Sequence, residues 1–255
     1  MQNETIGKSG NLTTHIYNSR TLMGEAAARM VADKISTLLT EQESINIIFA
    51  AAPSQNEFLA ALIKITDIEW GRINVFHMDE YIGLPKNDPR TFAAFLNEKI
   101  FNKKTFRSVN YIDGNANDLT AECDRYARLL LQFSSDIVCM GVGENGHIAF
   151  NDPPVADFND PLKVKVVALD AECRQQQVND GCFIQLSDVP THALTLTVPA
   201  LMAGRYIYCM VPGEKKGKAV YNTLHQSINE KYPSTILRKH TNAALFLDKD
   251  SSGLL

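Results

Sequence analysis

The sequence predicts an α/β fold: one domain built around a mostly parallel sheet that helices cover on both faces. Short, continuous apolar runs alternate with segments whose apolar residues recur at helical spacing, which is typical of parallel strands joined by helices. The 255 residues, 45% hydrophobic and 21% charged, have the composition of an ordinary globular domain. No linker rich in glycine, serine or proline divides the chain. We therefore expect residues 1–255 to form a single domain with a Rossmann-like sheet.

The first half of the chain carries most of this alternation. Apolar positions from Met23 to Leu38 follow a helical period, and the β-branched run 45–51 after them indicates a buried strand. Ser54 and Glu57 have the spacing of a capping box, which marks the start of the next helix. The pattern continues with helices near 54–65, 91–101 and 119–133 and strands near 73–78, 108–112 and 136–140.

The second half is less regular. We expect strands at 163–168, 193–198, 206–211 and 243–247 and a helix near 215–225. Prolines exclude a long helix from residues 151–161, which are either a functional loop or a plain connector.

Charge and composition exclude several classes of protein. A formal net charge of −4 gives no general attraction to nucleic acid, and no apolar run is long enough for a membrane helix. The polar start lacks a signal peptide, so we expect a cytoplasmic protein. The five scattered cysteines contain no Cys-x-x-Cys pair and predict neither disulfides nor a zinc site. The number of subunits is left open, a homo-oligomer included.

The carboxyl ends of the predicted strands are the expected place for a ligand in such a sheet. Asp79 and Glu80 follow the strand at 73–78, and only one of two adjacent carboxylates easily faces a cleft. Either could act as a general base, and either could simply stabilise a turn.

A glycine-rich turn follows the strand at 136–140. Residues 141–146 match G-x-G-x-x-G, but the prolines that follow leave no room for the helix of a dinucleotide site. Gly143 and Gly146 would still let the backbone approach a ligand closely, with His147 beside it. The histidine could equally be merely solvated.

Two strand-to-helix junctions are candidate anion sites. Ser54 and Gln55 begin one helix, whose free backbone N–H groups could bind a phosphate or could simply be capped. Lys216 begins another and could contact a phosphate as a point charge.

Together these residues resemble the glucosamine-6-phosphate deaminase (isomerase) family. The segment 76–84, FHMDEYIGL, is similar to the family's F-x-M-D-E-Y-x-G-L, and residues 113–126 to its N-G-N-A…A-E-C-x-x-Y. GVGENGHIAFNDP at 141–153 is similar to G-x-G-x-D-G-H-I-A-F-N-E-P, and 213–219 to the G-x-x-K helix start. The sister 6-phosphogluconolactonases usually continue Gly-His with T-A-S-L-F, which favours the deaminase branch.

The resemblance implies roles for individual residues. Asp79 becomes the base that moves a proton between C2 and C1 of an open-chain sugar, and His147 the acid/base that opens the ring. Asn145 and Asp152 stand where the family has Asp and Glu around this histidine. The acid/base relay around His147 therefore has one negative charge fewer, and one of its carboxylate side chains is shorter. Residues 51–55 replace the family's glycine-rich phosphate loop, and no arginine is a secure counterpart of its phosphate ligand. The expected substrate-binding residues are Glu80, Gly143, Gly146, Ser54, Gln55, Arg174 and Lys216, with no metal and no cofactor.

The function expected from this resemblance is conversion of an amino-sugar phosphate to a ketose phosphate and ammonia, without a nucleic-acid or membrane partner. Two alternatives are a sugar-phosphate lactone hydrolase, in which His147 activates water, and a sugar-phosphate sensor without catalysis. The changed Asn145 favours the sensor, whereas the retained Asp79 and His147 oppose it.

Overall fold

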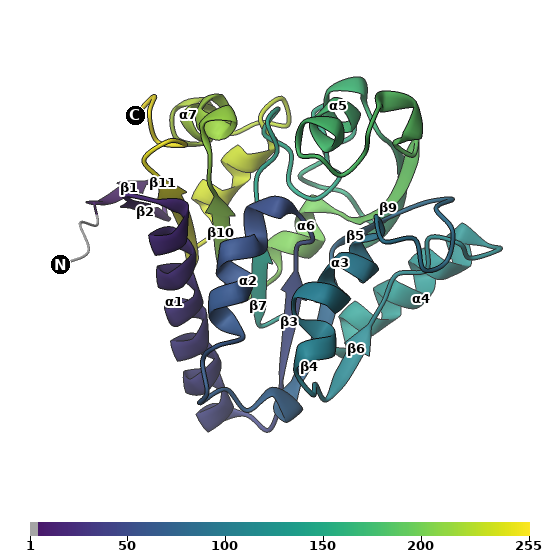
Figure 1. Ribbon diagram of the computed structural model, residues 1–255, viewed down its shortest axis with the longest axis horizontal. Helices are drawn as coiled ribbons and strands as arrows, with labels where there is room; N and C mark the ends of the chain where they lie inside the picture. The colour runs from purple at the N-terminus through teal and green to yellow at the C-terminus, as the bar shows by residue number, and fades with distance from the viewer. Residues whose placement is uncertain (1–4) are drawn as a thin grey trace.

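An eight-stranded sheet runs through the centre of the computed structural model, which describes residues 5–255 (Figure 1). Its strand order is β1-β2-β11-β10-β7-β3-β4-β6, and every neighbouring pair is parallel except the antiparallel β1–β2 hairpin. The predicted mostly parallel sheet is thereby confirmed. The strands are β1 (Thr5–Ser9), β2 (Leu12–Tyr17), β3 (Ile45–Phe49), β4 (Ile73–His77), β6 (Ser108–Asn110), β7 (Ile137–Met140), β10 (Tyr206–Val211) and β11 (Ala243–Asp248).

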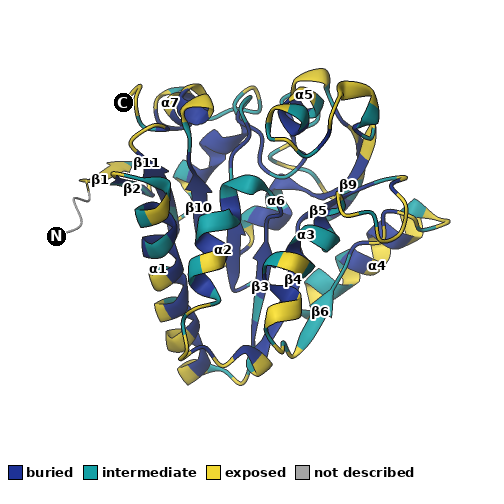
Figure 2. Cartoon of the chain, in the orientation of Figure 1, coloured by how far each residue is buried: buried dark blue, intermediate teal, exposed yellow. Residues whose placement is uncertain are grey.

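Helices cover both faces of this sheet, and alternate strand residues supply two cores. On β3, Ile47 and Phe49 pack with the first set of helices and Ile48 with the second, because successive side chains of a strand point to opposite faces. Figure 2 shows the buried strands between helices that expose only their outer sides. The first set is α1 (Arg20–Glu41), α2 (Asn56–Leu62) and α3 (Phe92–Lys99); the second is α4 (Leu119–Gln132), α6 (Val198–Met202) and α7 (Gly217–His225).

A second, antiparallel sheet lies beside the carboxyl ends of the main strands. It has the order β5-β9-β8, from β5 (Asp79–Tyr81), β9 (His192–Leu196) and β8 (Val164–Ala168). The strands expected near 163–168 and 193–198 thus exist but belong to this sheet. The chain leaves β4, bends at Met78 and re-enters a sheet at Asp79, so the pair Asp79–Glu80 lies on a strand rather than in a turn.

Several elements differ from the sequence prediction. The hairpin β1–β2, helix α6 and helix α5 (Ala171–Asn179) were not predicted. The capping box is wrong: Ser54 lies inside a 3₁₀ turn and caps no helix, and Glu57 instead pairs with Arg20 at 3.0 Å. The 3₁₀ turns are Pro53–Gln55, Trp70–Arg72, Phe101–Lys103, Leu186–Asp188, Glu214–Lys216 and Pro233–Lys239.

All five cysteines are free thiols. Between residues 5 and 255, no helix combines the length and the apolar character that a membrane crossing requires.

Candidate active site

A small cavity of about 60 Å³ opens where the strands of the main sheet end. Ser54 follows β3, Asp79 follows β4, His147 follows β7 and Lys216 follows β10, and all four line this cavity. Strand ends are where open α/β sheets bind ligands. Residues separated by up to 162 positions therefore meet in one place.

Asp79 and Glu80 face different surroundings. Asp79 is 7% exposed and lines the cavity. The Glu80 carboxylate turns away and accepts hydrogen bonds from the N–H groups of Tyr81, Phe92 and Ala93, the last two at the start of α3. Burial, and to a smaller extent the Glu80 charge, raise the pKa of Asp79 well above its ordinary value. A carboxyl raised in this way suits a base that works near neutral pH.

The turn after β7 packs the imidazole ring of His147 closely against the backbone of Gly143. Gly143 N–H donates to the His147 carbonyl, and Gly146 N–H donates to the Gly143 carbonyl, with Gly146 at φ 90°. A Cβ on Gly143 would lie 2.2–2.5 Å from three atoms of the imidazole ring. Glycine is therefore required at position 143 for the ring to lie where it does.

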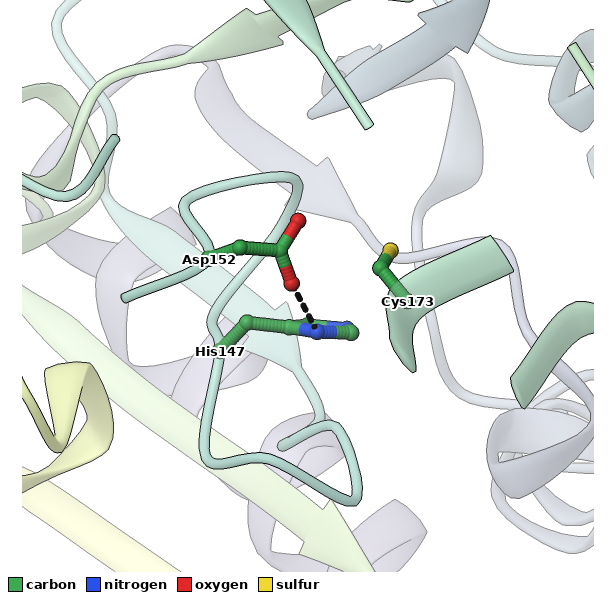
Figure 3. A group of neighbouring side chains, drawn as sticks. All are labelled: His147, Asp152 and Cys173. Atoms are coloured by element: carbon green, nitrogen blue, oxygen red, sulfur yellow. Dashed lines mark ion pairs between the residues drawn. The ribbon is translucent and has the colours of Figure 1, made fainter. Parts of the chain in front are cut away.

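Asp152 and Asn145 hold this ring in place (Figure 3). His147 Nδ1 lies 2.8 Å from Asp152 Oδ1, and the Asn145 amide donates to the same oxygen at 2.9 Å. The side-chain oxygen of Asn145 also accepts from the His147 backbone N–H. Burial acts to raise the pKa of Asp152, but the nearby His147 and the polar groups of His147, Asn145 and Cys173 hold it below the ordinary value. The shorter Asp152 thus still reaches the histidine.

Lys216 is the basic side chain that lines the cavity beside Ser54. It is 7% exposed, and burial lowers its pKa, with the carboxylates of Asp180 and Glu144 opposing that change. Gln55 lies beneath, with its amide 3.4 Å from the carbonyls of both Met140 and Met210. Gln55 thereby ties the loop after β3 to the ends of β7 and β10.

Arg174 does not join this group. Its guanidinium donates to the carbonyls of Leu186 and Val189, which fixes the chain that follows α5. The residues of α5 that do line the cavity are Gln176 and Gln177, followed by Asp180. Sequence reasoning missed them because α5 itself was not predicted; the polar run AECRQQQVN lacks an apolar period.

Cys173, also on α5, lies beside the His147–Asp152 pair. One potential ligand atom from each of His147, Asp152 and Cys173 falls within 4.8 Å of the other two, and all three residues are buried (Figure 3). We call these three residues the His–Asp–Cys cluster. Their positions in the sequence match no familiar metal-binding spacing, which is why the sequence did not reveal it.

A larger cavity, of about 640 Å³, lies on the other side of Glu80. Lys86, Asn97, Glu98 and Tyr111 are among its lining residues. Neither Asp79 nor His147 reaches it, so the smaller cavity is the one that unites acid, base and cation.

The comparisons with known proteins agree with this geometry. A family model described as glucosamine-6-phosphate isomerases/6-phosphogluconolactonase matches residues 18–246. Glucosamine-6-phosphate deaminase of Listeria monocytogenes is 32% identical over 90% of this chain and 96% of its own, and that of Streptococcus sanguinis 29% over 91% and 94%.

Solved structures show the same likeness. A monomeric glucosamine-6-phosphate deaminase superposes with a TM-score of 0.86 at 28% identity, over 95% of this chain and 99% of its own. The 6-phosphogluconolactonase of Thermotoga maritima shares the fold, with a TM-score of 0.76 at 19% identity over 93% and 100%. The fold, the arrangement of the strand ends and the extent of these matches lead to one conclusion: this chain belongs to the glucosamine-6-phosphate isomerase/6-phosphogluconolactonase family.

Proposed function

We propose that the protein is a deaminase that converts glucosamine 6-phosphate, or a related amino-sugar phosphate, to the ketose phosphate and ammonia. The observation that carries this proposal is the meeting of Asp79 and His147 in one cavity with Lys216. The relatives named as deaminases, at 28–32% identity, favour this reaction over lactone hydrolysis, since the Thermotoga lactonase is 19% identical.

In the proposed reaction His147 opens the sugar ring. Asp152 occupies Nδ1 of the imidazole, which leaves Nε2 to exchange a proton with the ring oxygen and the C1 hydroxyl. Opening the pyranose gives the C1 aldehyde, beside which the C2 proton becomes acidic. Asn145 contributes by fixing Asp152 and the backbone of His147.

Asp79 then moves a proton between two carbons. Its carboxylate takes the C2 proton, and the resulting enol-amine accepts a proton at C1, which leaves an imine at C2. Water adds to this imine and ammonia departs, giving the ketose phosphate. Lys216 binds the phosphate in this proposal, with the Ser54 turn beside it, because a charge-assisted contact is the strongest the cavity offers to an anion.

The test is to offer the purified protein glucosamine 6-phosphate and 6-phosphogluconolactone in parallel. We expect ammonia from the first and, in heavy water, deuterium at C1 and C2 of the sugar by proton NMR. Lactone loss without ammonia would instead identify a lactonase. Binding of the sugar phosphate with neither reaction would identify a sensor. The cytoplasmic location also stays a prediction, which cell fractionation would check.

A further inference from the structure

The His–Asp–Cys cluster contains a group that the proposed reaction does not use. Cys173 is 1% exposed and lies next to the pair that controls the acid/base histidine. Figure 3 shows its sulfur on the side of α5 that faces Asp152. The thiol contacts Asp152, but neither ring opening nor proton transfer includes a step that uses it.

The three side chains offer the donor atoms of a zinc site. Nitrogen, oxygen and sulfur donors together suit a borderline cation such as Zn²⁺, whereas Mg²⁺ and Ca²⁺ prefer oxygen alone. Zinc–ligand bonds of roughly 2.0–2.3 Å place tetrahedral ligand atoms about 3.5 Å apart. Ligand atoms that already lie within 4.8 Å of one another therefore need only small side-chain rotations to close on one ion.

A second observation supports a cation site in the cluster. Asp152 is 1% exposed, and its Oδ2 makes no hydrogen bond of good geometry within residues 5–255; besides His147 and Asn145, the polar side chain near this carboxyl is the Cys173 thiol, itself a member of the cluster. A buried carboxylate oxygen without a partner is costly, and a cation would remove that cost. The other oxygen, Oδ1, already accepts from the Asn145 amide, which is the kind of support that orients a metal ligand.

We propose that the His–Asp–Cys cluster binds a single divalent cation of the zinc class, and that the bound cation inhibits the enzyme. The inhibitory part rests on the proposed function. A cation binds the lone pair of His147 Nδ1, so the one N–H proton of the neutral imidazole must move from Nδ1 to Nε2, and Nε2 can no longer accept a proton from the sugar. Three protein ligands leave a fourth position for water or for an oxygen of the sugar.

The experiment compares the full-length wild-type protein with Cys173→Ser and with Cys182→Ser. Cys182 is the matched control, because it is a more accessible thiol that lies outside the cluster. Buffered Zn²⁺ should inhibit ammonia release by wild type and Cys182→Ser alike. Measured against its own metal-free rate, the Cys173→Ser protein should need about 100-fold more Zn²⁺ or beyond for the same fractional inhibition, since even outer-shell substitutions cost 10–100-fold in affinity.

Cobalt provides a readout that does not depend on catalysis. Wild type titrated with Co²⁺ should bind one ion per chain and gain thiolate-to-cobalt absorption, which Cys173→Ser should lack. His147→Gln should also lose tight binding, and thermal melts of the variants establish that they are folded. Equal metal affinity in wild type and Cys173→Ser would overturn the site, as would wild type that binds no Co²⁺. Cobalt binding without any ammonia release would leave the site standing and refute the proposed reaction instead.

Discussion

At the scale of single residues, Asp79 has the central role in the proposed reaction, because its carboxyl lines the cavity and burial raises its pKa. We expect Asp79→Asn to lower deuterium exchange at C1 and C2 by about 10²–10⁴-fold, the typical worth of a general base. Its affinity for fructose 6-phosphate, measured by calorimetry, should change little, since the substitution conserves volume. Exchange at the wild-type rate would show that another group moves the proton.

Lys216 and its neighbour Lys215 form a natural pair for testing the anion site. Lys216 is buried in the cavity, whereas Lys215 is exposed outside it. Lys216→Ala should weaken binding of fructose 6-phosphate by roughly 1.5–3 kcal/mol, the worth of a charged hydrogen bond, and that of fructose far less. Lys215→Ala should leave both unchanged. If Lys216→Ala weakened both ligands equally, the phosphate would bind elsewhere.

Gly143 allows a test of the position of His147 without removing the histidine. A methyl group at position 143 must push the imidazole away, because its three nearest atoms all belong to that ring. We expect Gly143→Ala to lower kcat on the order of 10²-fold, as misplacement by about 1 Å can. Gly71→Ala is the control, since a Cβ there meets nothing within 4 Å. An unimpaired Gly143→Ala enzyme would show that the observed ring position is not the active one.

At the scale of elements, Glu80 connects β5 to the start of α3. Burial raises its pKa to about 7, although three backbone N–H groups oppose the rise. Between pH 4.5 and about 7, the Glu80 carboxyl keeps its proton in the folded state but has lost it in the unfolded chain. The free energy of unfolding therefore falls as the pH rises through this range.

Glu80→Gln should remove this pH dependence. The variant should match wild type in unfolding free energy near pH 4 and gain on it by up to about 3 kcal/mol at pH 7 and above, which is the free energy that corresponds to a pKa raised from 4.5 to about 7. Urea titrations across this range would measure the difference. Glu98→Gln, an exposed change on α3, should show no such gain, and a constant offset for Glu80→Gln would contradict the account.

The elements also show how far the sequence could predict the structure. Buried strands such as β3 and β7, and helix α4, were found because periodicity and apolar runs reflect burial directly. The second sheet could not be found, because strand propensity does not say which strand is the neighbour. Ser54 and Glu57 matched a capping box, but the attraction of Arg20 for Glu57 is a tertiary contact that local spacing does not encode.

The residues of the site also divide into those that the sequence could place and those that it could not. Asp79, His147 and Lys216 could be predicted to meet because strand ends converge on one edge of a parallel sheet. Arg174 and the residues of α5 could not be placed, since α5 is polar and is fixed by contacts such as that of Gln176 with the backbone of Glu144. Cys173 stands in the sequence as an isolated thiol, because its partners are 21 and 26 positions away.

At the scale of the whole molecule, the cavity is too small for its proposed substrate. About 60 Å³ holds a few waters, whereas ligand sites typically offer roughly 300–1,000 Å³. Helix α5 lies over the carboxyl ends of the main strands (Figure 1) and closes the cavity through Gln176, Gln177 and Asp180. We therefore expect α5 to move away when the sugar binds, while the main sheet stays as it is.

The hydrogen bonds of Gln176 should resist this movement of α5. Its Oε1 accepts from the Glu144 backbone N–H at 2.8 Å, and its Nε2 donates to Asp180 at 3.2 Å. Gln176→Ala should make the amides of α5 exchange with heavy water about fivefold faster, for roughly 1 kcal/mol of lost hydrogen bonding, without affecting α4. Gln175→Ala, exposed on the same helix, should exchange as wild type does. Added fructose 6-phosphate should make α5 exchange faster in all three proteins, because a bound sugar keeps the helix away from its closed position. Exchange in α5 that responds to neither substitution nor ligand would mean that the cavity opens by another element.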